Sequence, residues 1–139
     1  MKHEVDGRRE IASRNTAWAN IIARKLTGWG ITPNQISIMS VFFALAGCLL
    51  LTGTVIYPDF NKYVAYILFV VCMQSRLLCN LFDGMVAIEG GKKSANGDLY
   101  NDMPDRFADA LFIIPVGYVA GGFGIELGWL AALLAVMTA

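Results

Sequence analysis

The chain carries no charged residue between Lys25 and Asp59, and this uncharged stretch constrains the fold more than any other feature. Within it, residues 36–57 form a run of 22, and a helix needs about 20 apolar residues to cross a bilayer. Hydrophobic residues make up 56% of the chain and charged residues 16%, against about 45–50% and about 25% in soluble domains. The sequence therefore predicts an integral membrane protein.

Three further apolar runs follow, at residues 63–88, 108–125 and 127–139. The last has 13 residues, whereas a span needs at least about 17, so we interpret the chain as ending within a span. We expect an all-α integral membrane fold with an N-terminal amphipathic surface helix and at least four transmembrane helices. Residues 1–139 are interpreted as one domain that is incomplete at its C-terminus.

The distribution of Lys and Arg predicts the orientation in the membrane. Six of them precede Pro33, whereas the two short connections between the apolar runs carry only one between them. The longer connection, residues 89–106, carries three. Because cytoplasmic loops are enriched in Lys and Arg, the N-terminus and this longer connection are predicted to be cytoplasmic. Residues 1–31 are then a cytoplasmic segment with a juxtamembrane helix.

An apolar stripe at helical spacing precedes the first span, formed by Ile11, Trp18, Ile22 and Leu26. Two glycines, Gly28 and Gly30, are expected to end this helix. Thr32 and Pro33 are typical of a helix start, with Thr as the N-cap and Pro at the first helical position. The stripe is interpreted as a surface helix that lies along the membrane.

Polar residues interrupt the second apolar run at i, i+4 and i+7, which places Arg76, Asn80 and Asp83 on one helical face. A second polar stripe lies on the next helix, formed by Asp98, Asn101, Asp105 and Asp109, with Asp102 at its margin. Ionisable groups within spans are costly and usually mark function. Facing each other, the stripes would offer oxygen ligands that suit magnesium, calcium or manganese. The only histidine is His3 and the three cysteines lie in apolar runs, which disfavours zinc.

Structural roles stay open for some of these residues. Asn and Asp within spans also serve as hydrogen-bond partners between helices. Asp98 and Asp102 lie at a helix start, where acids complement the helix dipole. Gly84, directly after Asp83, suits either a ligand lying on the backbone or a loosened helix end.

The spacing of these polar residues resembles the CDP-alcohol phosphatidyltransferase family, whose pattern is D-x2-D-G-x2-A-R-x8-G-x3-D-x3-D. This chain reads Asn80-x2-Asp83-Gly84-x2-Ala87-Ile88-x8-Gly97-x3-Asn101-x3-Asp105, and every gap length matches. Residues 32–37 are also similar to the family's usual entry into its first transmembrane helix. The resemblance covers residues 14–109.

The resemblance implies a multi-pass membrane transferase of phospholipid biosynthesis with six transmembrane helices, usually a homodimer. Such an enzyme moves a substituted phosphate group from a CDP-linked lipid to an acceptor alcohol and releases CMP. The motif does not specify the alcohol: inositol phosphate, glycerol phosphate and serine all fit. The zero net charge disfavours nucleic acid as a partner.

The resemblance also implies roles for individual residues. A divalent cation, Mg²⁺ or Mn²⁺, is expected at the four acidic positions, Asn80, Asp83, Asn101 and Asp105. Asp105, at the fourth position, is expected to act as the general base. Substrate contacts are expected from Gly84, Ala87, Gly97, Arg76 and Asn34.

Three positions depart from the family pattern. Asn80 and Asn101 replace acids, and Ile88 replaces the arginine after Ala87. Two negative charges are lost, which lowers the expected metal affinity because ligand charge tunes it. Arg76, one turn before Asn80, is the expected substitute for the missing phosphate partner. The departures leave a second interpretation open, a non-catalytic membrane binding or assembly subunit derived from the family, and a third, an unrelated transporter.

Overall fold

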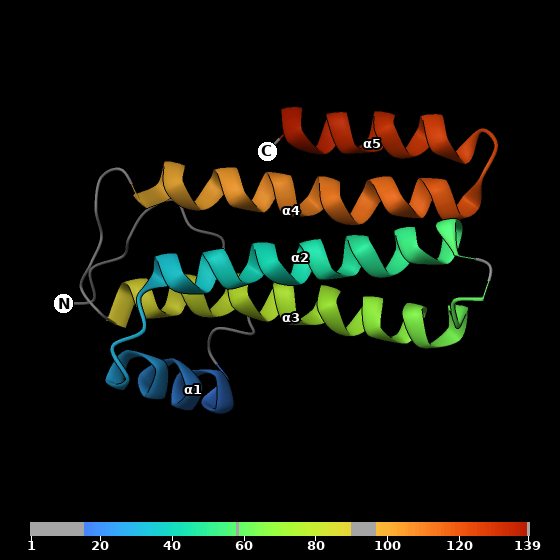
Figure 1. The fold of residues 1–139 in the computed structure, drawn as a ribbon. Coiled ribbons are helices and arrows are strands. Elements are labelled where there is room, and N and C mark those ends of the chain that lie inside the picture. The colour runs from blue at the N-terminus through green and yellow to red at the C-terminus, as the bar shows by residue number, and fades with distance from the viewer. Residues whose placement is uncertain (1–15, 58, 90–96, 139) are drawn as a thin grey trace.

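The computed structural model describes residues 16–57, 59–89 and 97–138, without the side chains of residues 89 and 97–103. The described residues form five helices and no strand: α1 Ala17–Gly28, α2 Pro33–Ile56, α3 Lys62–Glu89, α4 Gly97–Ala120 and α5 Gly124–Thr138. The predicted all-helical class is confirmed for this part of the chain. Helix α2 lies between α3 and α4, α5 covers the outer side of α4, and the short α1 packs on α3 (Figure 1).

The start of α2 is fixed by a reciprocal cap. The Thr32 hydroxyl accepts from the backbone N–H of Gln35 at 3.3 Å, and the Gln35 side-chain oxygen accepts from the Thr32 N–H at 3.0 Å. This capping box satisfies two of the N–H groups that a helix start leaves unpaired. Pro33 begins the helix, and α1 ends at Gly28 before Gly30 adopts a φ of +75°. Both predicted helix ends are confirmed.

The third apolar run, residues 108–125, differs in its bounds from the helix that contains most of it. Helix α4 begins earlier, at Gly97, and ends at Ala120. Gly121 and Gly122 then take φ values of +69° and +51°, which glycine adopts without a steric penalty, and the chain reverses into α5. The short connection expected between the third and fourth apolar runs is therefore present, but it begins directly after Ala120.

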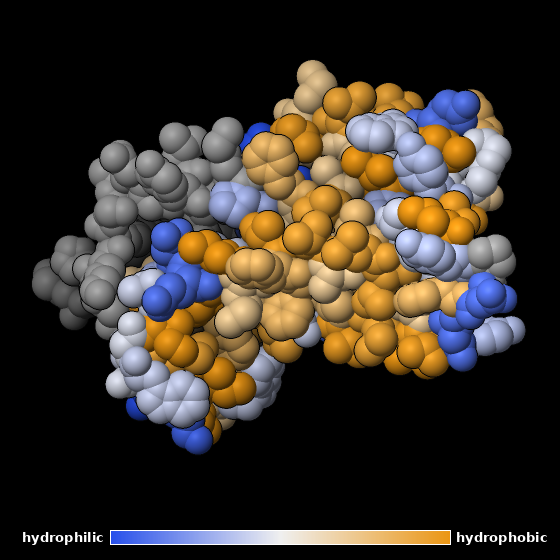
Figure 2. All heavy atoms as spheres, in the orientation of Figure 1, coloured by the Kyte–Doolittle hydropathy of each residue, from blue (hydrophilic) through white to orange (hydrophobic). Residues whose placement is uncertain are grey.

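Two helices, α2 and α3, are long and apolar enough to cross a membrane by length and composition. Helix α5 is apolar but shorter. In the view of Figure 2, apolar side chains cover the middle of the helices while hydrophilic residues gather toward the ends. The connection between α2 and α3 carries Asp59, α3 begins at Lys62, and the first turn of α5 carries Glu126.

Helix α1 packs through small side chains. Ala19 and Ala23 are fully buried and belong to one apolar cluster with Phe82 of α3. Trp18 and Ile22, from the predicted stripe, remain 47% and 38% exposed. Alanine lets the two helices approach closely, and Trp18 also packs edge to face on Phe82, with ring centroids 6.2 Å apart. Ile11 lies outside the described residues.

Helices α4 and α5 approach most closely at glycines. A Cβ placed on Gly117 would lie 2.6 Å from the carbonyl oxygen of Gly124 and 3.0 Å from the Cα of Gly128. Small residues at facing positions are the common way for membrane helices to bring their backbones together. The α4–α5 hairpin therefore depends on Gly117 and Gly128.

We expect Gly117→Ala to destabilise the protein by about 1–3 kcal/mol, because the obstructing atoms belong to backbone that cannot rotate away. The measurement is thermal unfolding in detergent. Gly47→Ala should cost less, since its Cβ meets side-chain atoms and not backbone: the Phe112 ring at 2.7 Å and the Phe69 ring at 3.4 Å. Gly28→Ala is the control, with no atom within 4 Å. An unchanged melting temperature in Gly117→Ala would contradict the close packing of α4 on α5.

Candidate functional site

The predicted polar stripe of α3 makes side-chain contacts with both α2 and α4. Asn80 connects all three helices. Its side-chain N–H donates to the Asp105 carboxylate of α4 at 3.0 Å, and its carbonyl oxygen accepts from the Ser40 hydroxyl of α2 at 3.4 Å. The first and fourth positions of the family pattern, 25 residues apart, are therefore in direct contact.

Asp83 lies one turn further along α3 and is 3% exposed. The Ser37 hydroxyl of α2 lies 3.1 Å from its Oδ2 atom and 3.2 Å from the Pro33 carbonyl oxygen. A buried carboxylate is costly unless donors compensate for the lost water. Ser37 is one such donor, so α2 takes part in holding the second acidic position.

Arg76 is the cation of this cluster, with a side chain only 8% exposed. Its Nη2 atom lies 2.9 Å from Oδ1 of Asp109 and 3.6 Å from Oδ1 of Asp105. The same nitrogen donates to the backbone carbonyl oxygen of Asp105 at 3.1 Å. The guanidinium thus binds two acids that are one helical turn apart on α4. Its contact with phosphate, expected from the sequence, stays a prediction.

The other predicted site residues are more dispersed. Gly84 and Ala87 are half-buried near the end of α3, whereas Asn34 is exposed in the first turn of α2. Gly97 is the first residue of α4. Asn101 lies in the second turn of α4, and its side chain is outside the described part of the chain, as are those of Asp98 and Asp102.

Two site residues were missed from the sequence, Ser37 and Ser40. Both hydroxyls act as donors to the polar stripe of α3. The signal was present, because the buried residues of α2 repeat at helical spacing and most are small: Ile36, Ser37, Ser40, Ala44, Gly47, Leu51 and Thr54. A stripe of small residues in a span predicts close helix contact. The serines in that stripe were the natural partners for the buried Asn and Asp of a neighbouring helix.

The donor chemistry of the cluster fits a hard divalent cation. Carboxylate and amide oxygens are the ligands that Mg²⁺ and Mn²⁺ prefer. Among the described residues, no three His, Cys, Asp or Glu side chains are grouped so as to hold one ion. The position beside Asp105 and Asp109 already holds a positive charge, the Arg76 guanidinium. Asp83, Asp105 and Asn80 are the described residues that would contribute to holding a divalent cation, and the binding of one stays a prediction.

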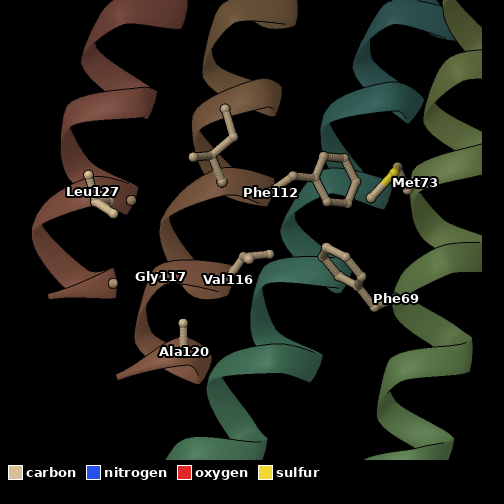
Figure 3. A pocket seen from close by; sticks show the side chains of 10 residues that line it. Phe69, Met73, Phe112, Val116, Gly117, Ala120 and Leu127 are labelled. Carbon is tan, nitrogen blue, oxygen red and sulfur yellow. The ribbon is translucent and has the colours of Figure 1, made fainter. Parts of the chain in front are cut away.

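A separate apolar cavity of about 410 Å³ lies further along α4, between α3 and α5 (Figure 3). Phe69 and Met73 of α3, Phe112 and Val116 of α4 and Leu127 of α5 are among its lining residues. Phe69 and Phe112 pack edge to face, with ring centroids 5.4 Å apart. None of the described residues that line this cavity carries an ionisable group.

Comparison of the chain with family models, with curated proteins and with solved structures finds no match.

Proposed function

We propose that the chain is an integral membrane transferase of the CDP-alcohol phosphatidyltransferase type. It would move a substituted phosphate group from a CDP-linked lipid to an acceptor alcohol with release of CMP. One observation carries this proposal. Asn80 on α3 and Asp105 on α4, the first and fourth positions of the pattern, are joined by a hydrogen bond of 3.0 Å from Nδ2 of Asn80 to Oδ2 of Asp105. Asp83, the second position, is buried one turn away. The contact between the first and fourth positions supports the proposal.

The surface of the helices supports a membrane setting. Large apolar side chains of α2, α3 and α5 are exposed along their length; examples are Phe42, Leu49, Ile67, Leu130 and Leu133. Aromatic residues gather near the outer connections, with Tyr57, Tyr63, Phe123 and Trp129 exposed. Such aromatic side chains favour the membrane interface. In this proposal the protein is multi-pass, with its N-terminus and the Arg76 cluster on the cytoplasmic side.

Asp105 and Asn80 have roles in the proposed reaction. The acceptor hydroxyl loses its proton to the Asp105 carboxylate as its oxygen forms a bond to phosphorus. The bond from phosphorus to the CMP oxygen breaks, and CMP leaves with the bonding electrons. Asn80 orients the Asp105 carboxylate through the 3.0 Å hydrogen bond. A bound divalent cation would neutralise charge on the diphosphate and the leaving group.

A second function is favoured by one observation: the carboxylates of Asp105 and Asp109 are already paired with Arg76. Asn80 presents an N–H rather than a negative oxygen to Asp105, and Arg76 is paired with Asp105 and Asp109. These contacts hold the acids without any ligand. A non-catalytic membrane subunit that keeps the fold and binds nucleotide or metal weakly would have this character.

The deciding experiment is CMP release by the purified protein in detergent. CDP-diacylglycerol is the donor, the acceptors are inositol phosphate, glycerol phosphate and serine, and Mg²⁺ is titrated. A transferase should release CMP only with a suitable alcohol and a divalent cation. CDP-lipid binding without CMP release for any alcohol would favour the non-catalytic subunit. If the protein neither binds the CDP-lipid nor releases CMP, both proposals are excluded.

A further inference from the structure

Arg76 lies where the family resemblance leads one to expect a metal ion. We propose that its guanidinium is the resident cation of the acid cluster, and that a divalent cation binds this cluster only by displacing it. The inference rests on the proposed function only in its choice of a divalent cation as the competitor of Arg76. Its test measures cation binding and requires no enzymatic turnover.

The contacts of Arg76 resemble those of a bound cation. A single nitrogen, Nη2, lies within 3.6 Å of three oxygen atoms: Oδ1 of Asp109, Oδ1 of Asp105 and the backbone oxygen of Asp105. Carboxylate and backbone carbonyl oxygens are also ligands for hard cations. The guanidinium therefore holds the oxygens that an incoming ion would need.

Charge makes the two occupants compete. An arginine in a protein is always protonated, so Arg76 cannot lose its charge to accommodate a metal ion. Two cations that share oxygen atoms a few ångströms apart repel strongly in a partly buried site. The asparagine at position 80 supplies no negative charge that would offset this repulsion. A divalent cation and the guanidinium are therefore alternatives at Asp105.

Two features of the surroundings are compatible with movement of the Arg76 side chain. Its Nε atom is buried and has no hydrogen-bond partner among the described residues, so part of the guanidinium is not held. The side chain of Asp109 is 47% exposed, and its Oδ1 atom makes the shortest ion pair with Arg76. In this proposal the guanidinium follows Asp109 outward when a divalent cation binds, and the contacts described above are those of the metal-free arrangement.

The test compares Mn²⁺ binding to the wild type, Arg76→Met and Arg76→Lys in the same detergent, with free Mn²⁺ measured by electron paramagnetic resonance. Removing the resident charge should raise Mn²⁺ affinity about tenfold or more in Arg76→Met. Arg76→Lys keeps the charge and should stay near the wild type. Equal binding by the wild type and Arg76→Met, or no binding by either, would overturn the proposal.

A second measurement uses the wild type alone and decides the question if Arg76→Met fails to fold. Phenylglyoxal modifies accessible arginines, and the peptide that contains Arg76 can be followed by mass spectrometry. Modification of Arg76 should rise several-fold when Mn²⁺ is added, with Arg24 of α1 as the internal control. Modification that does not respond to Mn²⁺ would refute displacement. Absence of CMP release together with the Mn²⁺ effect would refute the transferase and leave this inference standing.

Discussion

Asp105→Asn is expected to abolish phosphatidyl transfer while CDP-lipid binding largely survives. The substitution keeps the size of the side chain, but an amide cannot take the proton of the acceptor hydroxyl. Loss of a general base typically lowers the rate by about 10²–10⁴-fold. Asp105 is the only carboxylate that contacts both Asn80 and Arg76 in the described part of the chain, so no equivalent acid replaces it there. CMP release at saturating Mg²⁺ measures the effect.

Two matched variants separate the role of Asp105 from loss of charge in general. Asp59→Asn makes the same change in the exposed connection between α2 and α3 and should leave CMP release unchanged. Asp83→Asn should weaken Mg²⁺ and nucleotide binding instead, since it removes a buried ligand charge. Unchanged turnover in Asp105→Asn would assign the base to another residue.

Asn80→Asp is expected to make the stability of the protein depend on divalent cations. The new carboxylate would face Asp105 at the position where the Asn80 N–H now donates at 3.0 Å. A donor is replaced by a like charge, and two carboxylates this close cannot both stay ionised without a cation between them. We expect the free energy of unfolding to fall by about 2–3 kcal/mol in chelator. Added Mn²⁺ should recover that loss.

Thermal unfolding in detergent, in chelator and in millimolar Mn²⁺, is the measurement. Asn61→Asp is the control, because Asn61 caps α3 through a bond from the Val64 N–H at 3.2 Å and Asp caps equally well. Its melting temperature should not depend on Mn²⁺. A melting temperature of Asn80→Asp that is equally insensitive to Mn²⁺ would show that position 80 does not share a cation with Asp105. Replacing Asn101 as well should strengthen the Mn²⁺ effect, as the family pattern implies.

Local chemistry made several features predictable from the sequence. The Thr32–Pro33 start of α2 and the glycines after α1 depend on caps and on φ preferences, which involve only neighbouring residues. The polar face of α3 also follows from the 3.6-residue period, which places Arg76, Asn80 and Asp83 together whatever surrounds them. The turn between α4 and α5 was also expected, although the apolar run was carried to residue 125 because Gly121, Gly122 and Phe123 carry no charge that would mark the end of α4 at Ala120.

Only the tertiary structure decided what that polar face meets. Periodicity predicts which residues share a face of a helix. It does not predict which neighbouring helix packs against that face, or at which position along the helix axis. The contact between Asn80 and Asp105 joins residues 25 apart in sequence, and that between Ser37 and Asp83 joins residues 46 apart. Both exist because the small residues of α2 let α3 and α4 pack on either side of it. Arg76 likewise binds Asp105 and Asp109 because α4 places two acids one turn apart opposite it, where pairing compensates the cost of a buried charge.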